Sequence, residues 1–149
     1  MAKFRFELQN ILEIKQKMET QAKQEFTAAA GRFDTQQKLL DSMYKRKEDL
    51  QNSAQDVLTG SLNRRAIEEH QQTIIYLDGQ IEQQTNVVKR VELEMEKARL
   101  KMNDAVMERK TYDKLREKAF EEFVEDELKS ESKAVDELTS YTYGQKAKG

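Results

Sequence analysis

Apolar residues recur along this chain at alternating steps of four and three, the spacing that places one residue per turn on a single face of a coiled-coil helix. Residues at these positions are called the seam below. The longest regular series comprises Ile67, His70, Ile74, Leu77, Ile81, Gln84, Val88, Val91, Met95, Ala98, Met102, Ala105, Arg109 and Tyr112. Looser spacing continues toward Leu138, so the pattern predicts one continuous helix over about 64–140.

A second series lies in the first third of the chain. It comprises Phe4, Leu8, Ile11, Lys15, Met18 and Ala22, and then Phe26, Ala29, Phe33, Gln36, Leu40, Met43, Lys47, Leu50, Ala54 and Val57. The two consecutive steps of four around Ala22 predict a stutter, which locally unwinds a supercoil. This series predicts a helix over about 3–57.

Between the two series the sequence DVLTGSLNRR is suited to ending one helix and starting another. Gly60 suits a left-handed C-cap, and Ser61 or Asn63 suits the N-cap of the next helix. A tip at 58–63 lets the chain fold back and bury one apolar stripe against the other. We therefore expect an all-α fold, a long antiparallel two-helix coiled coil (helical hairpin) with unequal arms, as one domain over 1–149.

The second arm is longer than the first, which predicts a helical overhang at about 117–140 without an intramolecular partner. Residues 121–138 include eight acidic residues and two lysines, a net charge of −6. This overhang is either a solvated extension or a docking surface. The tail 141–149 continues no seam, and we expect it to fray.

Composition excludes several classes of function. The net charge is −2 and gives no basic face for nucleic acid. No apolar run reaches the roughly 18–20 residues of a membrane span, and the N-terminus lacks a signal-peptide apolar region, which favours a cytoplasmic protein. The chain has no Cys and no phosphate-binding glycine loop. The single His70 lies on a seam and is expected to pack or to contact a partner, so we expect no enzyme, cofactor or metal site.

Other apolar residues lie off the seam, where a two-helix coiled coil leaves many of them exposed. They are Phe6, Leu12, Ile14, Leu39, Tyr44, Leu62, Ile75, Tyr76, Val87, Leu93, Leu100, Val106 and Leu115. Those near the tip and those near the termini predict two separate protein-binding ends.

Three stretches resemble the FliJ family of flagellar type III export proteins. They are FRFELQNILEIKQKME at the N-terminus, and AVMERKTYDKLREK and ESKAVDEL in the second arm. The resemblance covers most of the chain, and the tail YTYGQKAKG departs from it. It implies a stalk that binds and stimulates a hexameric export ATPase, links it to the membrane export gate, contacts substrate chaperones, and lies at the inner face of the cell membrane.

Carried onto this sequence, the resemblance assigns two sets of contacts. Those to the ATPase ring fall where the termini run together, at Phe4, Phe6, Leu8, Arg109, Lys110 and Leu115. Those to the export gate fall on the two helical arms flanking the tip, at Met43, Lys47, Leu50, Thr73, Leu77, Gln80 and Gln84. We expect an elongated monomer. The alternatives are a homo-oligomeric coiled-coil spacer or tether, and a chaperone that holds unfolded substrates between its helices.

Overall fold

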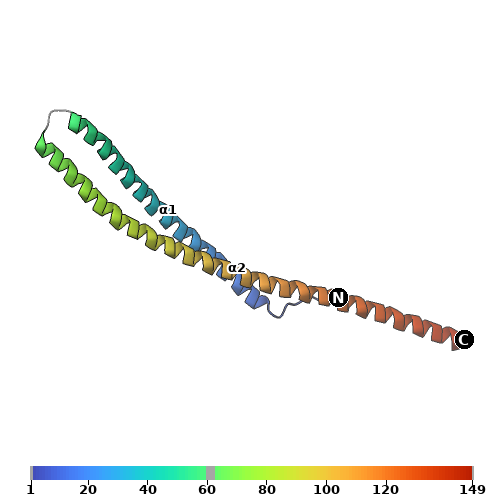
Figure 1. Ribbon diagram of the computed structural model, residues 1–149. Helices are drawn as coiled ribbons and strands as arrows, with labels where there is room; N and C mark the ends of the chain where they lie inside the picture. Colours follow the sequence, from blue (N-terminus) through green and yellow to red (C-terminus); the bar gives the residue numbers. More distant parts are fainter. Residues whose placement is uncertain (1, 60–62, 149) are drawn as a thin grey trace. The chain divides into compact units, whose positions relative to one another are not determined.

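Two α-helices make up the secondary structure of the described residues. The computed structural model describes the backbone of residues 2–59 and 63–148 and the side chains of residues 2–56 and 63–145. Helix α1 spans Gln9–Thr59 and helix α2 spans Arg64–Lys148, and the two pack as a hairpin (Figure 1). They are 51 and 85 residues long, and the described residues contain no strand. The predicted all-α antiparallel hairpin with unequal arms is confirmed.

Contacts between the helices group into two units, each containing a stretch of both helices. One unit is Met1–Thr20 with Asp104–Gly149, and the other is Gln21–Asn103. They are called the terminal unit and the distal unit below. In each, residue numbers rise along α1 as they fall along α2, as expected for antiparallel pairing.

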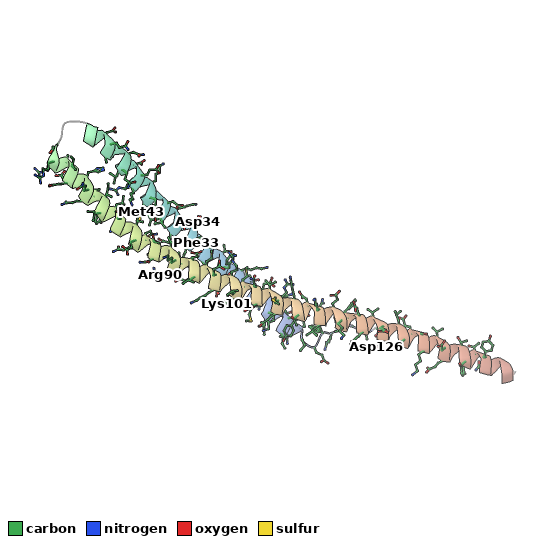
Figure 2. All side chains as sticks on the ribbon, viewed as in Figure 1. Phe33, Asp34, Met43, Arg90, Lys101 and Asp126 are labelled. Atoms are coloured by element: carbon green, nitrogen blue, oxygen red, sulfur yellow. The ribbon has the colours of Figure 1, made fainter. Side chains whose placement is uncertain are left out.

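The distal unit contains an apolar core between α1 and α2. Leu40 of α1 and Leu77, Ile81 and Val88 of α2 are 5–7% exposed. Phe33, Met43 and Leu50 of α1 pack against this cluster. Figure 2 labels Phe33 and Met43 on α1. All seven residues belong to the predicted seams, so the 4-and-3 spacing locates the core of this unit correctly.

In the terminal unit the seam differs from the predicted one. Leu12 and Glu19 are 2% and 7% exposed, whereas Ile11 and Met18 are 37% and 46% exposed. The seam of α1 therefore passes through Leu12 and Glu19, and the placement of Ile11 and Met18 on it was wrong. The prediction selected apolar residues for the seam, and it missed Glu19 because the carboxylate at position 19 is buried by pairing with an arginine of α2.

This correction also removes the predicted stutter. Leu12, Glu19, Ala22 and Ala29 are all buried, and Lys15 and Phe26 between them are half-buried. These positions follow one another at steps of three and four without a repeat. The 4-and-3 rhythm thus runs unbroken along α1, and no local unwinding is needed.

Helix α1 begins at Gln9 rather than at about residue 3. The Gln9 N–H donates to the Phe6 carbonyl over 3.1 Å, and the Leu12 N–H donates to the Leu8 carbonyl over 2.9 Å. The preceding residues run as a non-helical segment along α2 in the terminal unit, where Phe4 packs on aromatic rings. Residues 2–8 are called the N-terminal strap below.

The N-terminus of α2 is capped as the sequence predicts. The Asn63 side-chain oxygen accepts a hydrogen bond of 3.2 Å from the Arg65 N–H, and the Asn63 carbonyl accepts one of 3.1 Å from the Ile67 N–H. Both bonds satisfy donors of the first helical turn. The other predicted tip residues, Gly60 and Ser61, lie outside the described residues.

Helix α2 continues to Lys148, past residue 140, where the sequence pattern placed its end. A helix needs no seam to continue if its backbone bonds are made locally and nothing interrupts them. The Thr142 hydroxyl donates to the Leu138 carbonyl over 2.8 Å, and the Gln145 amide donates to the Tyr141 hydroxyl over 2.7 Å. From Leu128 to Gln145 every residue is exposed. The overhang predicted at 117–140 therefore begins later than expected, because Phe120 and Phe123 contact Phe4 of the same chain.

Candidate protein-interaction surfaces

The N-terminal strap is held on α2 by one aromatic cluster. The Phe4 ring lies 5.2 Å from that of Phe120, nearly perpendicular at 78°, and 5.5 Å from that of Phe123. The Arg116 guanidinium lies 5.9 Å from the Phe4 ring centroid, within the range of a cation–π contact. Edge-to-face pairs contribute about 0.5–1.5 kcal/mol beyond their burial, so Phe4 anchors the strap.

The strap and α2 form the two walls of a groove in the terminal unit, called the N-terminal groove below. Its volume is about 400 Å³. It is lined by Phe4, Arg5, Phe6, Glu7, Leu8, Leu115, Ala119, Glu122, Phe123 and Asp126. The lining combines an apolar floor with three carboxylates, a composition suited to binding another protein.

Four of the six residues assigned to the ATPase ring meet at this groove. Phe4, Phe6, Leu8 and Leu115 all line it. Arg109 does not, because it lies in the seam, and Lys110 is exposed outside the lining. Glu7, Glu122 and Asp126 were not assigned, because the extended strap that brings them together has no periodicity to reveal it.

Arg109 belongs to a buried ionic layer of the seam. Its Nε and Nη2 donate to the two Glu19 carboxylate oxygens over 2.5 and 3.3 Å, and its Nη1 donates to Asp113 over 2.7 Å. The Glu19 side chain is 9% exposed and that of Arg109 is 25% exposed. The hydrogen bond to Glu19, and then that to Asp113, raises the pKa of Arg109 above its ordinary value. Its donors are thus engaged inside the protein.

A second ion pair lies beside this layer. The Lys15 ammonium is 2.9 Å from a Glu108 carboxylate oxygen and 6.0 Å from the centroid of the Tyr112 ring. The hydrogen bond to Glu108 raises the pKa of Lys15 above its ordinary value. The charged seam positions of α1 are therefore matched by oppositely charged residues of α2, which fixes the register in the terminal unit.

Removing both members of the Glu19–Arg109 pair is expected to cost less stability than the two single removals added together. Glu19→Ala and Arg109→Ala should each lower the Tm by several degrees, because the remaining partner is left uncompensated inside the seam. The Tm of the double variant should fall by less than the sum of the falls in the two single variants. Circular dichroism melting measures this, with exposed Glu117→Ala as the control; strictly additive losses would contradict the pairing.

A second groove lies in the distal unit and is called the distal groove below. It has a volume of about 310 Å³ and is lined by Leu39, Ser42, Met43, Arg46, Tyr76, Leu77 and Gln80. Leu39 is 44% exposed and Tyr76 is 70% exposed, so large apolar surface faces solvent at its mouth. Both were predicted from the sequence as off-seam apolar residues.

The residues assigned to the export gate divide between this groove and the seam. Met43, Leu77 and Gln80 line the groove, but Leu77 is only 5% exposed. The others lie elsewhere. Lys47 is 2.7 Å from Asp78, Leu50 packs on the core, the Thr73 hydroxyl donates to the Glu69 carbonyl, and Gln84 is buried. Leu39, Ser42, Arg46 and Tyr76 complete the groove and were not assigned.

Gln84 and His70 are polar residues on the seam of the distal unit. The Gln84 amide donates to the Gln36 carbonyl over 3.0 Å and to the Gln36 side-chain oxygen over 2.8 Å, which satisfies it while buried. His70 is half-buried, and its Nε2 has no hydrogen-bond partner among the described residues. His70 is thus partly covered at its seam position, and the prediction that it packs or contacts a partner stays a prediction.

The other off-seam apolar residues follow the prediction only in part, because Phe6, Val87 and Val106 are half-buried. Leu62 lies outside the described residues. Ile14, Tyr44, Ile75, Leu93 and Leu100 are 52–70% exposed. Leu12 was placed among them and is instead buried on the corrected seam.

These features define the class of protein as an all-α antiparallel coiled-coil hairpin with apolar grooves in both of its units. A family model described as "Flagellar FliJ protein" matches residues 4–148, nearly the whole chain, so the chain belongs to the FliJ family. It is thus a component of flagellar type III protein export, in a family of non-enzymatic export components. No curated protein and no solved structure was found to match the chain.

None of the helices described at 9–59 and 64–148 contains an apolar stretch that would allow it to cross a lipid bilayer.

Proposed function

We propose that the chain is a non-enzymatic stalk of the flagellar export apparatus that binds and stimulates a hexameric export ATPase and links it to the membrane export gate. It would act in the cytoplasm at the inner face of the membrane and would also contact substrate chaperones. The observation that carries this proposal is that part of each assigned contact set lines a separate groove. Four ATPase-side residues line the N-terminal groove, and three gate-side residues line the distal groove.

A coiled-coil hairpin suits this role because it presents different surfaces along its length without a catalytic pocket. Neither groove brings together a nucleophile and a base, since their charged residues are Arg5, Glu7, Glu122 and Asp126 in one and Arg46 in the other. A stalk that binds only the assembled ATPase ring would stabilise that ring by mass action.

The proposal is tested by separating the two contacts with exposed variants. Leu115→Asp changes a residue of the N-terminal groove that is 42% exposed, and Tyr76→Asp changes one of the distal groove that is 70% exposed. Leu115→Asp should weaken stimulation of the ATPase at least about tenfold and leave gate binding intact, because a charge replaces an apolar contact. Tyr76→Asp should have the opposite effect.

Purified ATPase turnover and pull-down of the gate protein measure the two activities. Both variants should keep the helical content of the wild type, because neither changed side chain is buried. Equal loss of both activities in each variant would count against two separate contacts. Failure of the wild-type chain to bind either partner would overturn the proposal.

A homo-oligomeric spacer or tether is the second candidate. It is favoured by the apolar residues of the overhang, since Leu128, Val135 and Leu138 are 59–66% exposed. Light scattering at micromolar concentration separates the candidates, because the spacer would be a dimer or larger and the stalk a monomer.

A further inference from the structure

We infer that the N-terminal groove binds a basic amphipathic helix, which places apolar side chains on the floor of the groove and Lys or Arg side chains at its acidic rim. This inference deepens the proposed function, on which it rests for the identity of the protein that supplies the helix. The chemistry of the helix follows from the groove itself.

The floor of the groove is apolar and open to solvent. Leu115, Ala119 and Phe123 lie four residues apart on α2, and Phe6 and Leu8 of the strap face them across the groove. Leu115 is 42% exposed, and the other four are half-buried. A contiguous apolar surface of this kind on a monomer indicates a binding site for a partner.

The rim of the groove is acidic. Glu7 of the strap and Glu122 and Asp126 of α2 line it, with Arg5 as the single basic residue of the lining (Figure 2 labels Asp126). None of the three carboxylates has an ion-pair partner among the side chains described at 2–56 and 63–145. Residues 121–127 contain five acidic residues and no basic one. The rim therefore keeps a negative field that favours a cationic ligand.

The shape of the floor favours a helix. Residues spaced by four form a ridge along α2, and a ridge of this kind packs into the groove between side chains of a second helix. From Leu115 to Phe123 the ridge is about 12 Å long, which corresponds to about two helical turns of the ligand. Recognition would follow the helix-in-groove mode, with apolar anchors at helical spacing and long basic side chains reaching the rim.

The full-length chain can be tested with two synthetic amphipathic helical peptides. One has leucines on one face and lysines on the other, and the second has glutamates in place of the lysines. Fluorescence anisotropy should show binding of the basic peptide and none of the acidic one. Equal binding of both peptides, or of neither, would overturn the inference.

Charge reversal at the rim provides the decisive variant. The double substitution Glu122→Lys, Asp126→Lys should weaken binding of the basic peptide at least about tenfold, because it replaces two attractive rim charges by repulsive ones. The matched control is Asp136→Lys, Glu137→Lys, which changes the net charge equally on exposed residues of α2 outside the groove. The control pair lies about 15 Å along the helix from the rim pair, beyond the roughly 8 Å screening length at physiological salt.

The control should stay within about twofold of the wild type. If it is impaired as strongly as the rim variant, the attraction is a general property of the acidic helix and the inference fails. Phe4→Ala adds a test of shape. Loss of this anchor should release the strap and weaken binding of the basic peptide, although no charge changes.

Two further outcomes separate this inference from the proposed function. If the peptide behaves as expected but the export ATPase does not bind, the proposed function fails and the inference stands. If the ATPase binds equally to the wild type and the rim variant, the inference fails alone. A wild-type dimer that Leu115→Asp dissociates would show a second copy in the groove and would also overturn the inference.

Discussion

Leu12→Ala is expected to lower the free energy of unfolding by about 2–5 kcal/mol, the usual cost of deleting the side chain of a buried leucine. Leu12 is 2% exposed, the lowest value among the described large apolar residues, and it lies on the seam of the terminal unit. The substitution removes apolar contacts and leaves a cavity that a two-helix interface refills poorly. The Tm should fall by roughly 2–4 °C for each kcal/mol lost.

The neighbouring residue provides the control. Ile11→Ala removes a side chain of similar size that is 37% exposed, and it should cost about 1 kcal/mol or less. The two variants together test which residue the seam contains, because the sequence pattern placed Ile11 on it and the structure places Leu12 there. Thermal and urea unfolding followed by circular dichroism measure both. If Ile11→Ala lost more unfolding free energy than Leu12→Ala, the seam and stutter predicted from the sequence would be correct.

The difference between these residues explains which parts of the fold the sequence could reveal. Leu40, Leu77, Ile81 and Val88 are apolar and spaced by helical repeats, so their burial follows from spacing alone. Glu19 is charged, and its burial depends on a partner ninety residues away in the chain. No periodicity rule places a carboxylate in a core unless the partner arginine and the register are already known.

The N-terminal groove could be predicted only in part for a related reason. The resemblance assigned Phe4, Phe6, Leu8 and Leu115 to one contact, and the structure brings these residues to one groove. The three rim carboxylates were missed because residues 2–8 were expected to be largely helical. A helical N-terminus would point Glu7 and Phe6 in different directions, whereas the strap brings both to one groove.

The distal groove shows the opposite limitation. Leu39 and Tyr76 were recognised as off-seam apolar residues, but the resemblance assigned the gate contacts to seam positions such as Leu77 and Gln84. These two residues are 5% and 8% exposed. A partner that contacts the closed hairpin would reach the exposed residues of the groove, so mutations of the two classes should act by different routes.

Leu77→Asp is therefore expected to unfold the distal unit rather than to remove a surface contact. Leu77 packs with Leu40 and Ile81, and an aspartate there would place a carboxylate in an apolar cluster without a partner. The expected loss is about 4 kcal/mol or more, because the charge must be neutralised or hydrated at the expense of packing. Melting followed by circular dichroism should show a lower Tm and a lower helical content at 37 °C.

Two controls separate the lost packing from the added charge and the surface contact. Leu77→Ala removes the same side chain without adding a charge and should be destabilised by about 2–5 kcal/mol, less than the aspartate variant. Tyr76→Asp adds the charge at a neighbouring residue that is 70% exposed and should change stability by only about 0.5 kcal/mol. If Leu77→Asp kept the wild-type Tm and lost gate binding, Leu77 would be a contact residue that leaves the seam. If Tyr76→Asp kept both the Tm and gate binding, the distal groove would not be the gate surface.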